Sequence, residues 1–252
     1  MKAAYYISLA AAALAILAFS APAPAATMDS RIVSSARKSY VFKTYLQGDD
    51  IRIDSKEGAV TLTGFIAASF HKTLAQETLA GLPGVRSVDN RLEVRGSSPT
   101  ANSDMWLSDK VKITLLFHRS LNSGRTEVEV KDGVVTLRGS AISQEQKELT
   151  AEYARDVEGV KDVSNEMAVE TAPAAVPRTT SEKIDDVSVA ALVRMALLLH
   201  HSTSGAYTTV AVRRGVATVG GKARTAAEKD QVSRIVKDVN GVTAVKNLMT
   251  IK

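Results

Sequence analysis

Histidines and carboxylates are the side chains of this sequence best suited to catalysis or metal binding, so their spacing is the first question. The chain has four histidines and no cysteine. His200 and His201 are adjacent, and on a helix their side chains would point about 100° apart, too far to share a metal ion. The lack of cysteine excludes disulfides, thiolate metal ligands and a cysteine nucleophile.

The remaining candidates do not form a catalytic set either. His118 and His200 occupy equivalent places at the predicted ends of two helices, where a partly cationic ring suits the helix dipole. No histidine or carboxylate lies at metal-ligand spacing from them. Glu145, Glu148 and Glu152 fall at i, i+3 and i+7, which indicates a solvated helix face. We therefore predict no catalytic residue, no metal site, no cofactor and no enzymatic activity.

A second group of residues suits binding rather than catalysis. A predicted helix carries, besides its core-facing residues, an apolar stripe of Leu192, Met195 and Leu199. An exposed apolar stripe beside basic residues is typical of a surface that lies on an anionic membrane. We predict lipid binding by this stripe and by the basic residues that follow it. In the alternative interpretation, another part of the protein covers the stripe and the charges are only solvated. The basic residues are Arg213, Arg214, Lys222 and Arg224.

Both groups lie within a pattern that occurs three times. A short alternating strand bounded by glycines spans residues 58–64, 133–139 and 215–221. A Gly-Val step follows each closing glycine at a constant spacing, and an asparagine follows that step, again at a constant spacing. Because every anchor keeps its register in all three places, the pattern indicates one small domain written three times. The anchors after the strands are Gly84, Gly159 and Gly241, then Asn90, Asn165 and Asn247.

Each copy has the same predicted elements. A helical pattern is followed by two alternating runs joined by a tight turn, which predicts a β-hairpin. A second helix follows, with capping boxes at Ser143 and Thr225, whereas copy 1 has Ala68 at this position. A last alternating strand ends the unit. Because the second helix connects two strands, we predict a three-stranded mixed sheet with both helices on one face. The fold class is therefore α+β, a tandem array of three αββαβ two-layer sandwiches.

Proline-containing polar stretches divide the chain. We predict linkers at residues 97–103 and 171–181, because proline is unfavourable inside helices and strands. The three domains are then copy 1 at residues 28–96, copy 2 at 104–170 and copy 3 at 182–252.

Residues 1–26 have the pattern of a secretory signal peptide. Lys2 supplies a positive start, residues 7–19 an apolar run, and Ala23-Pro24-Ala25 a small-residue cleavage site. The apolar run is shorter than the ~20 residues that a membrane-spanning helix needs. We therefore predict cleavage and export rather than anchoring.

Charge is distributed unevenly among the copies. The chain has a net charge of +5, with +2 in copy 1, −4 in copy 2 and +5 in copy 3. Copy 3 is therefore the one suited to an anionic partner. Nucleic acid is not the predicted partner, because export is predicted and Tyr207 is the only aromatic residue of copy 3 that could stack on a base.

The repeated pattern resembles the BON family of bacterial exported domains. The resemblance is carried by Gly133 to Gly139, by Gly159-Val160 and by Val163 to Met167, and copy 3 departs from it at Ala217, Val219 and Leu248. It implies an αββαβ fold, periplasmic residence, attachment to phospholipid membranes, often in envelope maintenance or osmotic stress, and no catalysis. The family's functional residues cannot be transferred, since it has no universal ligand motif.

The resulting hypothesis is a non-enzymatic periplasmic protein that binds anionic phospholipid. The alternative is a protein-interaction or chaperone-like module that associates with envelope proteins or with itself.

Overall fold

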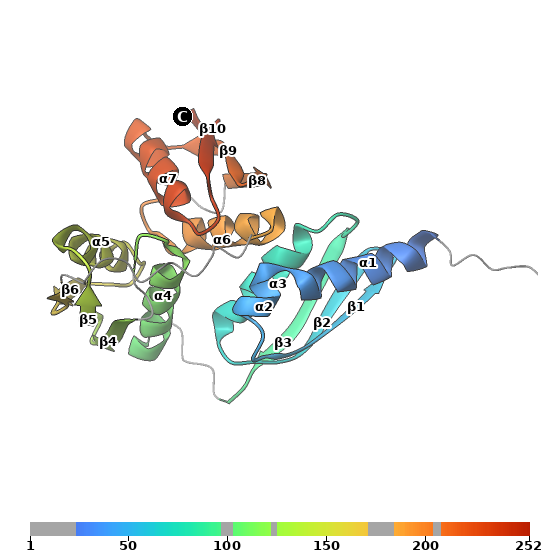
Figure 1. The fold of residues 1–252 in the computed structure, drawn as a ribbon, viewed down its shortest axis with the longest axis horizontal. Helices are drawn as coiled ribbons and strands as arrows, with labels where there is room; N and C mark the ends of the chain where they lie inside the picture. The colour runs from blue at the N-terminus through green and yellow to red at the C-terminus, as the bar shows by residue number, and fades with distance from the viewer. Residues whose placement is uncertain (1–23, 97–102, 122–124, 171–183, 204–207) are drawn as a thin grey trace, which may run out of the picture.

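The structure is a computed structural model that describes residues 24–96, 103–121, 125–170, 184–203 and 208–252, with side chains from Met28 onward. It contains three repeated α+β units, as predicted (Figure 1). Most of the predicted signal peptide and of both predicted linkers lies outside the described residues. Residues 24–26 already belong to the first helix.

Copy 1 has a first helix in two parts. The break lies at Ser39, whose side chain accepts from the backbone N–H of Phe42 and so caps the second part. The elements are α1 (Pro24–Lys38), α2 (Tyr40–Thr44), β1 (Asp50–Lys56), β2 (Ala59–Ile66), α3 (Ser69–Ala80) and β3 (Ser87–Val94).

Copies 2 and 3 share one pattern, in which the last strand is interrupted. In copy 2 the elements are α4 (Asp104–Phe117), β4 (Thr126–Lys131), β5 (Val134–Ala141), α5 (Gln144–Arg155), β6 (Asp162–Asn165) and β7 (Ala168–Val169). In copy 3 they are α6 (Asp186–Leu199), β8 (Thr208–Arg213), β9 (Val216–Ala223), α7 (Ala226–Asp238), β10 (Ala244–Asn247) and β11 (Thr250–Ile251).

The central strand of each sheet pairs antiparallel with the hairpin strand before it and parallel with the last strand, as predicted for a mixed sheet. Figure 1 shows the helices of each copy on one side of its sheet. Alternate residues of the central strands are therefore buried beneath the helices. Val60, Leu62, Val135, Leu137, Ala217 and Val219 all have exposures of 0–1%. The other face of each sheet is left open.

An aspartate near the start of each first helix holds the hairpin turn. Asp104 accepts hydrogen bonds from the backbone N–H groups of Asp132 and Gly133, at 2.8 and 3.0 Å. Both turn residues have positive φ, 52° and 82°, as a type I′ turn requires. Asp29 and Asp186 make the same pair of contacts in copies 1 and 3.

The recurring asparagines join the last strand to the second helix. In copy 2 the Asn165 side chain donates to the carbonyl of Lys147 at 2.6 Å and accepts from the backbone N–H of Met167 at 3.2 Å. Asn90 and Asn247 make the equivalent contacts. The predicted caps are also present, since Ser143 and Thr225 accept from backbone N–H groups and Ala68 makes no side-chain cap.

The closing glycine of the repeated strand is needed because two backbones approach closely there. Gly64 has φ +118°, and a Cβ added to it would lie 1.9 Å from the carbonyl oxygen of Asp50 on the paired strand. Gly139 is equivalent, with the carbonyl oxygen of Arg125 at 1.9 Å. A structural role therefore accounts for both glycines.

Gly64→Ala is expected to lower the free energy of unfolding by about 2 kcal/mol or more, because the new methyl group clashes with backbone and φ is unfavourable. Gly48→Ala is the matched control, since no atom lies within 4 Å of the added Cβ. Urea unfolding measures both. Equal stability of the two variants would contradict the close approach.

Candidate functional site

The four basic residues of the predicted lipid site lie on the sheet side of copy 3. Arg213 ends β8, Arg214 lies in the hairpin turn and Lys222 lies on β9. Arg224 follows β9 and forms an ion pair with Glu228, with Nε and Oε2 3.1 Å apart. All four basic residues are exposed. The structure therefore leaves this basic group accessible.

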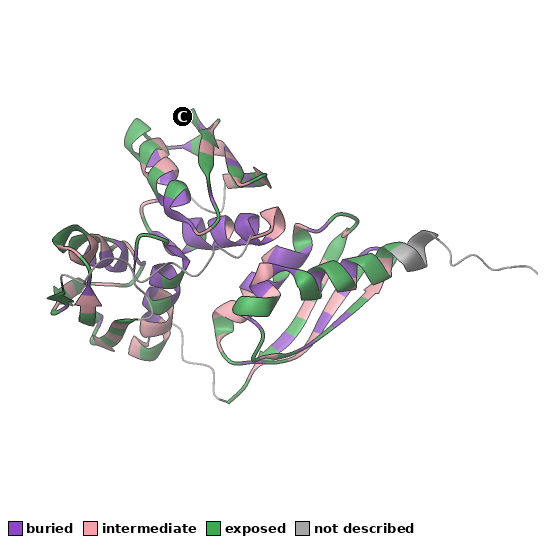
Figure 2. Ribbon diagram, viewed as in Figure 1, coloured by how far each residue is buried: buried purple, intermediate pink, exposed green. Residues whose placement is uncertain are grey.

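The apolar stripe of α6 is not on the surface. Leu192, Met195 and Leu199 have exposures of 0%, 3% and 7%. The expectation that this stripe is exposed is therefore wrong, and cover by other copies, the interpretation kept open, describes the structure. Figure 2 shows α6 as the most continuously buried helix of the molecule.

The reason is that α6 packs against helices of all three copies. It contacts α3 of copy 1, α4 of copy 2 and α7 of its own copy, and its own strand β8 lies on a further side. Where copy 2 has Asp109 and Lys110, copy 3 has Ala191 and Leu192, and both replacements have 0% exposure. Most of the surface of α6 is apolar and most of it is buried, whereas Leu198 is exposed.

Polar contacts fix the position of copy 1 on this helix. Asp185, the N-cap of α6, accepts from the backbone N–H of Tyr40 at 2.8 Å, and Ser188 accepts from that of Val41 at 3.1 Å. At the far side, Arg194 and Glu77 form an ion pair at 3.5 Å. The start of α2 and the end of α3 are thereby attached to copy 3.

Copies 2 and 3 meet through a pseudo-two-fold contact. His118 of copy 2 forms an antiparallel bridge with Val239 of copy 3, and His200 of copy 3 forms the same bridge with Val157 of copy 2. Backbone hydrogen bonds repeat the relation, from Arg119 to Asp238 at 2.9 Å and from His201 to Asp156 at 2.7 Å. Residues 118 and 200 are equivalent positions of the repeat, and so are residues 157 and 239. Each contact that copy 2 makes to copy 3 is therefore also made by copy 3 to copy 2. The interface is therefore self-complementary, as in a symmetric dimer.

At its centre the two equivalent histidines face each other. The Nε2 atoms of His118 and His200 lie 3.1 Å apart, and both rings are buried. Nδ1 of His200 is 2.7 Å from Asp156 Oδ2, and Nδ1 of His118 is 3.3 Å from Asp238 Oδ2. Tyr153 stacks on His118, with ring centroids 3.9 Å apart, and donates to Asp238 at 3.0 Å. We call the two histidines and their two aspartates the histidine row.

The contacts of His118 are unequal. Its Nδ1 is the one buried side-chain nitrogen or oxygen that has no hydrogen-bond partner of ordinary geometry in the described part of the chain, although Asp238 Oδ2 lies 3.3 Å away. Burial lowers the pKa of His118; contact with Asp238 opposes this, and His200 adds to the lowering.

This arrangement could not be predicted from spacing along the chain. No carboxylate lies at ligand spacing from the histidines in the sequence, but Asp156 and Asp238 are brought to them by the packing of two copies. For His118, burial lowers the pKa and so opposes the cationic ring that the helix dipole would favour. The available signal was the recurrence of both the histidine and the aspartate at the same positions of two copies. Among the described residues no group of histidines and carboxylates has metal-binding geometry.

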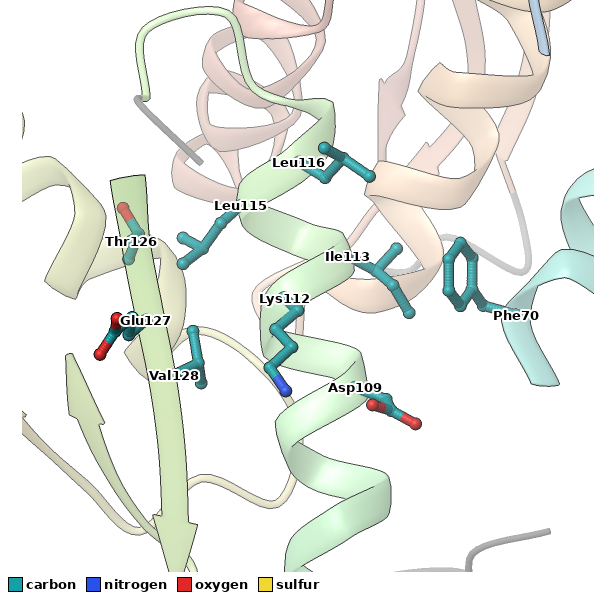
Figure 3. Close-up of a pocket in the computed structure, with 9 residues that line it drawn as sticks. All are labelled: Phe70, Asp109, Lys112, Ile113, Leu115, Leu116, Thr126, Glu127 and Val128. Atoms are coloured by element: carbon teal, nitrogen blue, oxygen red, sulfur yellow. The ribbon is translucent and has the colours of Figure 1, made fainter. Parts of the chain in front are cut away.

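A hollow with a volume of about 550 Å³ lies between copies 1 and 2 (Figure 3). Phe70 of α3 faces Ile113 and Leu116 of α4 across it. Figure 3 shows its two carboxylates, Asp109 and Glu127, on opposite sides of α4. Among the described residues no histidine lines it, and its two acidic groups do not converge.

Comparison with known proteins agrees with this repeated architecture. A family model described as the BON domain matches residues 28–96, 103–171 and 185–252. The chain belongs to the BON domain family. The osmotically-inducible protein Y of Escherichia coli (strain K12) is 32% identical over 143 residues, which cover 55% of this chain and 71% of that protein.

Solved structures resemble this BON protein only distantly. CdsD, a structural protein of the type III secretion system of Chlamydia trachomatis, is 18% identical with a TM-score of 0.25, covering 88% of this chain and 92% of that one. The PrgH periplasmic domain is 11% identical with a TM-score of 0.20, covering 82% and 97%. No helix in the described ranges of the BON protein is both long and apolar enough to cross a membrane.

Burial of the α6 stripe predicts a large effect on stability. Leu192→Ala is expected to lower the free energy of unfolding by about 2–5 kcal/mol, because it leaves a cavity in the core. Leu198→Ala on the same helix, where the side chain is 47% exposed, is expected to change it by less than ~1 kcal/mol. Denaturant unfolding measures both. A Leu192→Ala variant as stable as the parent would place the stripe at the surface.

The histidine row predicts a pH dependence. Because the folded-state pKa of His118 is lowered, the unfolded chain binds the proton more tightly, and stability is lost as pH falls through about 6.5 toward the folded value. His118→Gln is expected to flatten the plot of unfolding free energy against pH between about 7.5 and 5.5. His201→Gln, on the exposed neighbouring residue, is the control. An unchanged slope in His118→Gln would contradict the assignment of a buried neutral ring.

Proposed function

We propose that this BON protein is a non-enzymatic periplasmic protein that binds anionic phospholipid membranes through copy 3. The observation that carries the proposal is the separation of charge between copies of one fold. Copy 3 has a net charge of +5 and copy 2 of −4, and the basic group of copy 3 is exposed. A concentration of exposed basic residues binds anionic bilayers with ~1 kcal/mol for each residue near the surface.

Burial of the apolar stripe changes the mode of binding from that first expected. Leu192, Met195 and Leu199 serve as the core between copies, so the proposed contact is electrostatic and made by the basic group. Binding of this kind weakens as salt screens the charges. In the interaction-module alternative the stripe docks another copy or an envelope protein. The stripe packs against other copies of the same chain, so it is not free to bind an envelope protein. The basic group consists of Arg213, Arg214, Lys222 and Arg224.

Periplasmic residence and a role in osmotic stress or envelope maintenance belong to the same proposal. They are supported by the export signal predicted at residues 1–26 and by the similarity to the osmotically-inducible protein Y of Escherichia coli. The non-enzymatic part is supported by the side-chain geometry. Both rings of the histidine row are buried, and the two carboxylates of the hollow between copies 1 and 2 lie on opposite sides of α4.

Co-sedimentation of the full chain with vesicles tests this proposal. We expect binding to phosphatidylglycerol vesicles that falls steeply between about 50 and 300 mM salt, and little binding to phosphatidylcholine vesicles. Arg213→Glu is expected to weaken binding about tenfold or more. Lys131→Glu, the same charge change at the equivalent position of copy 2, is the matched control and should bind like the parent.

Two results would count against the proposal. Absence of binding to phosphatidylglycerol by the parent chain would remove lipid binding altogether. Equal weakening by Arg213→Glu and Lys131→Glu would remove the assignment to copy 3.

A further inference from the structure

The open face of the copy 3 sheet differs from the equivalent faces of copies 1 and 2. Strand register defines which residues share this face. Val216, Thr218, Gly220 and Lys222 alternate with the buried residues of β9. Their partners on β8 include Arg213 and Ala211, and their partners on β10 are Ala244 and Lys246.

No acidic residue lies at these positions in copy 3. The basic residues Arg213, Lys222 and Lys246 come from three different strands and are all exposed. None of the three forms an ion pair with any residue that the structure describes. The face extends over residues 216–222, about 20 Å at the rise of a strand. It is therefore a broad surface whose charges are all positive.

The equivalent face of copy 2 has the opposite character. Arg138 at its centre forms ion pairs with Glu129 at 2.6 Å and with Glu166 at 2.9 Å. The equivalent residues of copy 3 are Gly220, Ala211 and Leu248, so all three members of this network are replaced. Two further acidic residues of the copy 2 face, Glu127 and Asp162, are replaced in copy 3 by Thr209 and Ala244.

Copy 1 has a balanced face, which makes copy 3 the exception. At the equivalent positions it has three basic and three acidic residues, and one ion pair, Arg91–Asp89, lies among them at 2.6 Å. These residues are Arg52, Lys56, Arg91, Asp54, Asp89 and Glu93.

Apolar side chains accompany the positive charges of copy 3. Val216 is 39% exposed and Leu248 is 54% exposed. The backbone N–H of Leu248 continues the pairing with β9 by donating to the carbonyl of Val219 at 2.7 Å, as that of Glu166 does with Leu137 in copy 2. Since Glu166 reaches Arg138 on the open face, Leu248 lies over the same face. Basic groups around exposed apolar ones suit the headgroup region of a bilayer.

We propose that this open sheet face is the surface on which the protein lies against an anionic phospholipid bilayer. The proposal rests on the proposed function and assigns its binding site. It adds Lys246, Val216 and Leu248, which the sequence analysis did not select, to Arg213 and Lys222. It excludes the buried stripe of α6. The charge complementarity of the face selects an anionic partner, and its exposed apolar side chains select a bilayer rather than a soluble anion.

Transplanting the acidic residues of copy 2 onto copy 3 tests the assignment. The triple variant Ala211→Glu, Ala244→Asp and Leu248→Glu places on the face residues that the same fold already accepts at positions 129, 162 and 166. We expect at least a tenfold loss of affinity for phosphatidylglycerol vesicles in co-sedimentation, with circular dichroism and the thermal midpoint near those of the parent. The full chain is used throughout.

The control changes the net charge by the same three units on the other layer of copy 3. Arg234→Glu combined with Lys237→Gln alters exposed residues of α7 and should bind within about twofold of the parent. An equal loss of vesicle affinity in both variants would contradict binding by this face and would show that only the net charge of the protein matters. If the triple variant bound vesicles like the parent, the assignment to this face would be wrong, although lipid binding itself would stand. If the parent chain did not bind vesicles, the proposed function would be wrong.

A further experiment distinguishes binding to a bilayer from binding to a soluble anion. Inorganic phosphate at millimolar concentration, with ionic strength held constant by sodium chloride, should leave vesicle binding unchanged within about twofold. Displacement by phosphate under these conditions would show that the face binds a free anion and would overturn the commitment to a bilayer.

Discussion

A helix with apolar side chains around most of its surface must be covered around most of its surface, and α6 imposes this constraint on the whole molecule. Its own sheet covers one side, as in the other copies. The remaining sides require α7 and helices from copies 1 and 2. Burying this surface stabilises the arrangement by roughly 25 cal/mol for each Å² of apolar area removed from water. The relative positions of the three copies therefore depend on a change of residue type along one helix, from Asp109 and Lys110 to Ala191 and Leu192.

The same constraint assigns different roles to the two layers of copy 3. Its first helix, α6, is occupied by contacts with the other copies, whereas the basic residues of its open sheet face remain exposed. In copy 2 that face is neutralised by the ion pairs of Arg138 with Glu129 and Glu166. In copy 3 the equivalent positions are apolar or small, and the surviving charges are basic. The copies thus share one fold, but in copy 3 the helix layer packs against the other copies and the sheet layer carries the exposed basic residues.

The unit itself could be predicted from the sequence because its determinants are local. Glycines at tight turns, capping hydroxyls and alternating strands act within a few residues of each other, and three copies reinforced every signal. The helix-start aspartates and the asparagine links are local in structure but 28 or 18 residues apart in sequence. The sequence showed the asparagine as a recurring position but not the helix carbonyl that it binds, and it did not show the role of the aspartates.

Contacts between copies could not be predicted in this way. Periodicity identified the apolar stripe of α6 correctly but could not show what would cover it, since membrane and protein both satisfy an apolar surface. The histidine row was missed for a related reason. His118 and Asp238 belong to different copies, and their meeting depends on how two separately folded units pack. The basic residues were found by composition, but their common face required strand register, which is why Lys246 and Leu248 were overlooked.

The pseudo-two-fold contact between copies 2 and 3 has a consequence for assembly. A self-complementary interface uses the same patch on both members, so each patch is consumed once the pair has formed. A head-to-tail contact, in contrast, would leave an unused end on the last member and could add further molecules into a filament. Because the pairing through His118 and His200 is satisfied within one polypeptide, these particular patches are closed to growth, and repetition of the domain does not by itself create a polymer.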